Sequence, residues 1–155
     1  MNAATQARRA APASPSAPDS GVIVAGLIAF AAVHFALAIF MAVAPHEFYT
    51  AIGPFGARND HYIRDNATYN AALGLGLAIS VRRPAWRIPV LAVTTVQFAL
   101  HSINHLADIG DAHPAWVGYF DFFALAAASL QLAWLLRLAM SPSREPTRPL
   151  EVRSK

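Results

Sequence analysis

The sequence predicts an all-α fold, an integral membrane four-helix bundle with its N and C termini in the cytoplasm. Three observations favour this fold class. Hydrophobic residues make up 55% of the 155-residue chain and charged residues only 14%, a balance typical of membrane proteins. Four apolar stretches each approach the ~20 residues that cross a bilayer. Most Lys and Arg residues lie in two tails and one short loop, as expected for cytoplasmic segments.

The chain divides into three regions. Residues 1–20 are rich in Ala, Pro and Ser, a composition typical of a disordered tail, and residues 141–155 form a second polar tail. The bundle between them has predicted spans at 21–44, 63–81, 88–109 and 115–140. The first span is longer than the apolar region of a signal peptide, so we expect it to be retained.

The connections and the second span have distinct compositions. Residues 45–60 are polar and contain Gly and Pro, so they predict a loop, and residues 110–114 predict a turn. The second span is the least apolar of the four. Ala72, Gly76 and Ser80 form a stripe of small residues along it, which predicts close packing against another helix.

The distribution of arginine predicts the orientation in the membrane. The loop between the second and third spans carries Arg82, Arg83 and Arg87, and both tails are basic. The loop between the third and fourth spans has no Lys or Arg. Because basic loops stay in the cytoplasm, we expect a multi-pass protein of the inner (plasma) membrane with both tails inside.

A polar stripe on the third span is the best candidate for a functional site. His101, His105 and Asp108 stand at i, i+4 and i+7, which places them on one helical face with Asn104 beside them. Ionisable side chains at membrane depth are costly, so they usually face the bundle interior and mark a functional site.

The other spans add polar residues in the same outer half of the predicted bundle. The candidate ligand-binding residues on these spans are Asp65, Tyr69, Asn70, Asp121 and His34. Of the polar residues, His34 and, on the third span, Gln97 approach mid-membrane. Their shared depth predicts a polar pocket that opens outward. If this pocket is a site, Asp65 and Asp121 should approach His101 and His105 closely enough to form hydrogen bonds.

Four interpretations of this pocket are open. His101, His105, Asp108 and Asp121 are residue types that hold a metal ion. His34 and His101 could instead be the axial ligands of a haem. The pocket could bind a quinone or another lipid-like molecule through hydrogen bonds. In the fourth interpretation the polar groups only lock the helices together.

Two classes of function are excluded or disfavoured by composition. The chain has no cysteine, which excludes disulfide scaffolds, thiol redox motifs and cysteine nucleophiles. Its net charge of +3 does not indicate a nucleic-acid partner, because the basic residues do not form a patch interleaved with aromatic side chains. The expected partners are the lipid bilayer and either another membrane protein or a second copy of the chain.

The second span carries a short family motif. The stretch Arg64-Asp65-x-x-x-Tyr69-x-x-x-Leu73-Gly74-Leu75-Gly76-Leu77 resembles the second span of DoxX-like and related small bacterial four-span proteins. The resemblance covers about residues 23–138. It implies a four-helix membrane bundle and, for some members, an association with quinone-linked or thiol oxidoreductases. The absence of cysteine does not fit a thiol role.

The sequence therefore predicts a small multi-pass membrane protein with an outward-facing pocket of His and Asp residues, acting as an accessory or small-ligand-binding subunit. The alternatives are an oxidoreductase subunit that binds a quinone, metal or haem, and a structural partner protein.

Overall fold

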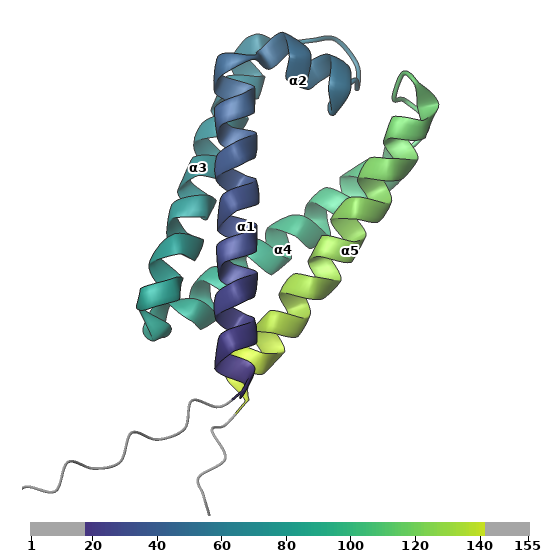
Figure 1. Ribbon diagram of the computed structural model, residues 1–155. Helices are drawn as coiled ribbons and strands as arrows, with labels where there is room; N and C mark the ends of the chain where they lie inside the picture. Colours follow the sequence, from purple (N-terminus) through teal and green to yellow (C-terminus); the bar gives the residue numbers. More distant parts are fainter. Residues whose placement is uncertain (1–17, 142–155) are drawn as a thin grey trace, which may run out of the picture.

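The computed structural model describes residues 18–141, and this part of the chain is helical, which confirms the predicted all-α fold class (Figure 1). The long helices are α1 (Pro18–Val43), α3 (Asp60–Arg82), α4 (Arg87–Ala107) and α5 (Ala115–Met140). Shorter elements are α2 (Pro45–Ala51) and the 3-10 turn η1 (Pro84–Trp86). The predictions for residues 1–17 and 142–155 lie outside the described residues.

Local signals explain where the helices begin. The side chain of Asn59 accepts hydrogen bonds from the backbone N–H groups of His61 and Tyr62, at 3.1 and 3.2 Å. This N-cap starts α3 three residues before the predicted span. Helix α2 lies within the predicted loop, where Pro45 has the fixed φ that suits a first helical turn.

The helices form two pairs. Helix α1 packs along α3, and α4 packs along α5. The pairs meet at the end where the described chain begins and ends, and they diverge toward the other end (Figure 1). There the loop after α2 reaches back to the α4–α5 turn through an isolated bridge between Phe55 and Ala112.

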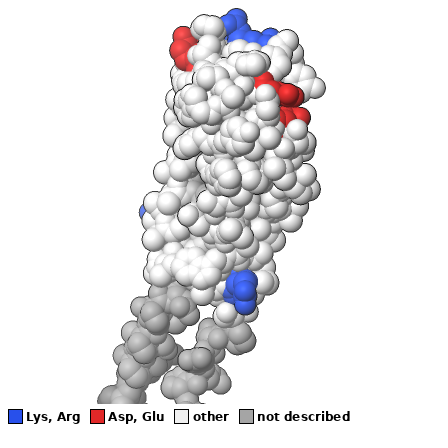
Figure 2. Space-filling view, turned by 90° about the vertical axis from the view of Figure 1, so that its right-hand side faces the viewer, with Lys and Arg blue, Asp and Glu red and all other residues white. Residues whose placement is uncertain are grey.

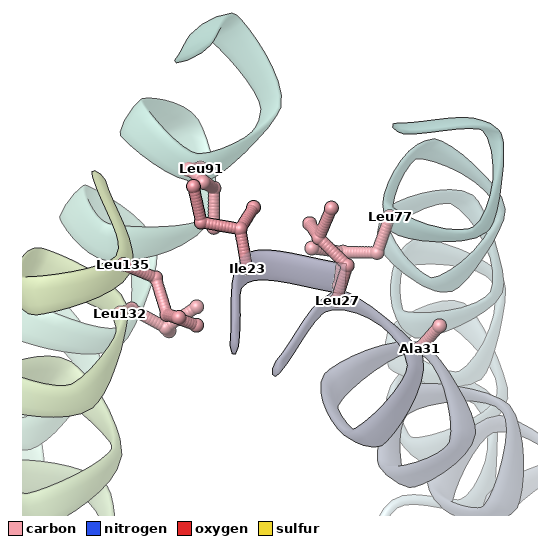
Figure 3. Close-up of a cluster of buried hydrophobic side chains, with 7 residues drawn as sticks. All are labelled: Ile23, Leu27, Ala31, Leu77, Leu91, Leu132 and Leu135. Carbon is pink, nitrogen blue, oxygen red and sulfur yellow. The ribbon is translucent and has the colours of Figure 1, made fainter. Parts of the chain in front are cut away.

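An apolar cluster joins all four long helices near the chain termini (Figure 3). Its members are Ile23, Leu27 and Ala31 of α1, Leu77 of α3, Leu91 of α4, and Leu132 and Leu135 of α5. Burial of these aliphatic side chains fixes the two pairs against each other at this end. The polar residues of α4 lie further along the helix, beyond the cluster.

A glycine allows the close contact of α1 with α3. A Cβ atom at Gly74 would lie only 3.2 Å from the Cβ of His34 and the Cδ1 of Phe35. The predicted stripe of small residues packs closely only at Ser80, which is buried. Ala72 and Gly76 instead line a gap beside Trp86 and Val90. Close packing at this level therefore depends on Gly74.

The surface is consistent with a membrane protein. Two helices, Ser20–Val43 and Ala115–Met140, are long and apolar enough to cross a membrane, and most of their side chains are not buried in the fold. On the face shown in Figure 2, charged side chains gather at the upper end, and the surface below them is mostly uncharged, with isolated Lys or Arg side chains in the lower part. Helices α3 and α4 contain more polar residues and are less apolar than these two helices.

Candidate functional site

A cleft of about 570 Å³ opens between α3 and α4, on the side of the molecule. We call it the polar cleft. Its lining consists of Tyr69 from α3 and of Ala92, Val93, Val96, Gln97, Leu100, His101 and Asn104 from α4. Gln97, His101 and Asn104 stand at i, i+4 and i+7, so one face of α4 presents all three to the cleft. The structure thus brings together three of the predicted ligand residues: Tyr69, His101 and Asn104.

Of the polar α4 residues that line this cleft, Gln97 lies nearest the N-terminal end of the helix. Its Oε1 atom is buried and has no hydrogen-bond partner within the described residues. A buried amide oxygen without a donor is costly, so the described fold leaves part of the hydrogen-bonding capacity of Gln97 unused. Gln97 was not a predicted ligand, although its position four residues before His101 places it on the same helical face.

Behind the cleft, His101 contacts His105, which forms a buried polar pair with Asp121. The rings of His101 and His105 meet edge to face with centroids 4.7 Å apart. The Nδ1 of His105 lies 4.0 Å from the Oδ2 of Asp121, which is longer than a hydrogen bond. Both atoms are buried without a partner in the part of the chain that is described. Asp121 therefore approaches the histidines as predicted, but without the predicted hydrogen bond.

An aromatic side chain covers this pair from the loop side. The Phe55 ring packs edge to face on His105, with centroids 4.9 Å apart. The bridge from Phe55 to Ala112 holds this loop over the end of α4. The position of Phe55 depends on contact between two loops that are far apart in the sequence, and no sequence signal indicated it.

His34 occupies the interface between the helix pairs and does not line the polar cleft. Only 1% of its surface is exposed. Its Nδ1–H donates to the backbone oxygen of Phe30 at 2.8 Å, and its ring packs on Phe98 with centroids 5.5 Å apart. These contacts give the imidazole a packing role inside the bundle.

Three further predicted site residues, in addition to His34, His105 and Asp121, do not line the cleft. Asp65 is exposed and faces His61, with 3.5 Å between Oδ2 and Nε2, so the prediction that it approaches His101 and His105 is wrong. The reason is that His61 and Asp65 stand at i and i+4 on the exposed face of α3. Asn70 donates to the backbone oxygen of Asn66 at 2.9 Å, and Asp108 is exposed at the C-cap of α4.

The predicted metal ligands are not gathered at one point. Within residues 18–141 no group of three or more His, Cys, Asp or Glu side chains is arranged to hold a metal ion. Of the predicted set, the structure pairs His105 with Asp121, places His101 against His105, and leaves Asp108 at the exposed end of α4.

No protein-family model, curated protein or solved structure matches this chain.

Proposed function

We propose that α1, α3, α4 and α5 all cross a membrane, with both chain termini on the cytoplasmic side. The 23 residues of α3 and the 21 of α4 rise ~35 and ~31 Å, which suffices for a hydrocarbon core of ~30 Å. On α4, Val93, Val96, Leu100 and Ile103 are each 58–60% exposed. An apolar stripe of this kind is suited to contact with lipid.

The charges at the two ends support this orientation. At the end that holds the apolar cluster, α3, η1, α4 and α5 carry Arg82, Arg83, Arg87 and Arg137. At the opposite end, Glu47, Asp60, Asp65 and Asp111 accompany Arg58 and Arg64. The positive-inside rule assigns the arginine-rich end to the cytoplasm. The polar cleft then lies in the outer half of the membrane.

Within this bundle, we propose that the polar cleft binds a small ligand. The observation that carries the proposal is the open cleft itself, to which α4 presents the polar side chains of Gln97, His101 and Asn104. The Oε1 of Gln97 has no donor among the described residues, so the fold does not use the full hydrogen-bonding capacity of this side chain. A ligand with hydrogen-bonding groups pairs with the polar side chains of the cleft and so binds selectively.

The residues of the cleft take different roles in this proposal. Gln97, Tyr69 and Asn104 contact the ligand through hydrogen bonds, and His101 forms the wall between the ligand and the buried pair. His105 and Asp121 act as positioning residues behind His101. This role suits an accessory or ligand-binding subunit.

The test is native mass spectrometry of the purified protein. The wild type should carry a small-molecule adduct, and His101→Ala should lose it while its circular dichroism spectrum remains helical. His61→Ala is the matched control, because His61 is an exposed histidine outside the cleft, and it should retain the adduct. A wild type without an adduct, or a His101→Ala protein that retains it or fails to fold, would contradict the proposal.

A further inference from the structure

A second cleft adjoins the polar cleft. It has a volume of about 520 Å³ and also lies between α3 and α4, toward their cytoplasmic ends. We call it the apolar cleft, because its lining includes Leu73, Gly76, Trp86 and Val90 and has no charged side chain. Val93 lines both clefts, so they meet at this residue.

Polarity changes in one direction along the two clefts. From Trp86 to Gln97 the helical rise is ~17 Å, and the lining over this distance is almost entirely apolar. Beyond it, His101 and Asn104 from α4 and Tyr69 from α3 supply the polar groups. The paired clefts therefore match a molecule with a polar head toward the outer surface and an apolar tail toward the cytoplasmic side.

The chemistry of the polar end restricts the head group. Neither cleft is lined by Lys or Arg, so a phosphate or carboxylate would be buried there without a counter-charge. The polar side chains of Tyr69, Gln97 and Asn104 offer both donors and acceptors of hydrogen bonds. A hydroxyl group both donates and accepts hydrogen bonds and carries no charge, so it suits these side chains.

We propose that the paired clefts bind a single-tailed, uncharged amphiphile with a hydroxylated head, such as a monoacylglycerol, that enters sideways from the bilayer. This inference rests on the proposed ligand site and adds the class of ligand and its orientation. The head lies between Gln97 and Tyr69, and the tail passes Val93 to reach Trp86. The small residue Gly76 leaves room for the tail in the apolar cleft.

Trp86 provides a direct test of the tail position. The full-length chain with Trp116→Phe and Trp134→Phe keeps Trp86 as its one tryptophan, and both replaced side chains are more than half exposed on α5. This protein is placed in phosphatidylcholine nanodiscs and titrated with a monoacylglycerol that carries bromine near the tail end. Bromine quenches tryptophan fluorescence on contact, so saturable quenching is expected at a low fraction of the added lipid.

Four comparisons define the expected result. Brominated phosphatidylcholine should give only gradual, non-saturating quenching. The fatty acid with the same brominated tail should bind about tenfold more weakly. Val93→Phe should block the junction of the clefts and weaken monoacylglycerol binding about tenfold, as should Gln97→Leu. Ile103→Phe, a change of similar size at an exposed α4 residue outside both clefts, should have no effect.

The outcomes separate this inference from the proposed ligand site. Saturable quenching that depends on Gln97 but not on Val93 would overturn the tail position and leave the ligand site standing. Equal binding of the fatty acid would overturn the uncharged head. If quenching never saturates, the amphiphile is wrong, and the His101→Ala adduct measurement separately decides whether the polar cleft binds another ligand.

Discussion

The substitution Asp121→Asn distinguishes a functional role of this residue from a purely structural role in holding the helices together. Only 8% of Asp121 is exposed, and its Oδ2 has no hydrogen-bond partner among the described residues. Asparagine has nearly the same shape as aspartate but carries no charge, so packing is preserved. The substitution therefore changes only the electrostatic and hydrogen-bonding character of this buried group.

The sign of the stability change follows from the geometry. At 4.0 Å the carboxylate of Asp121 gains no hydrogen bond from His105. Burial of an unpaired polar group costs about 1–3 kcal/mol, and more when it is charged. Asparagine still carries the cost of an unpaired polar group and removes only the additional cost of the charge, so we expect Asp121→Asn to raise the free energy of unfolding by about 1 kcal/mol. If Asp121 instead formed an ion pair that holds α4 and α5 together, loss of this partner would lower the free energy of unfolding by about 3–5 kcal/mol.

The assay is unfolding by sodium dodecyl sulfate in mixed micelles, followed by circular dichroism. Leu132→Ala calibrates the scale, because Leu132 is fully buried in the apolar cluster and its truncation should cost about 2–5 kcal/mol. An Asp121→Asn protein that unfolds as early as Leu132→Ala would refute the reasoning and establish Asp121 as a structural residue.

Three further predictions test the fold and its orientation. Gly74→Val should cost about 1–3 kcal/mol through overpacking against α1, whereas Gly21→Val, where a Cβ meets nothing within 4 Å, should have little effect in the same assay. Asn59→Ala removes the N-cap of α3 and should cost about 1 kcal/mol. A fluorescent protein fused after Lys155 should fold and fluoresce in the cytoplasm, and phosphatase activity of the corresponding alkaline phosphatase fusion would contradict the topology.

Only part of the candidate site could be predicted from the sequence. Helical periodicity placed His101 and Asn104 on one face, and the structure shows both in the polar cleft. The same reasoning grouped Asp65 with them by depth alone, but depth does not determine the direction of a side chain. Asp65 lies on the exposed face of α3 beside His61.

By itself, the sequence determined the all-α class and the approximate ends of the long helices, because apolar run length, proline and capping residues act within one or two turns of the chain. Only the tertiary structure decided which helices pair, that Gly74 and not Gly76 forms the close contact of α3 with α1, and that α3 and α4 leave two adjoining clefts between them. These features depend on the rotation and crossing of helices, which are set by side-chain packing between residues far apart in the chain.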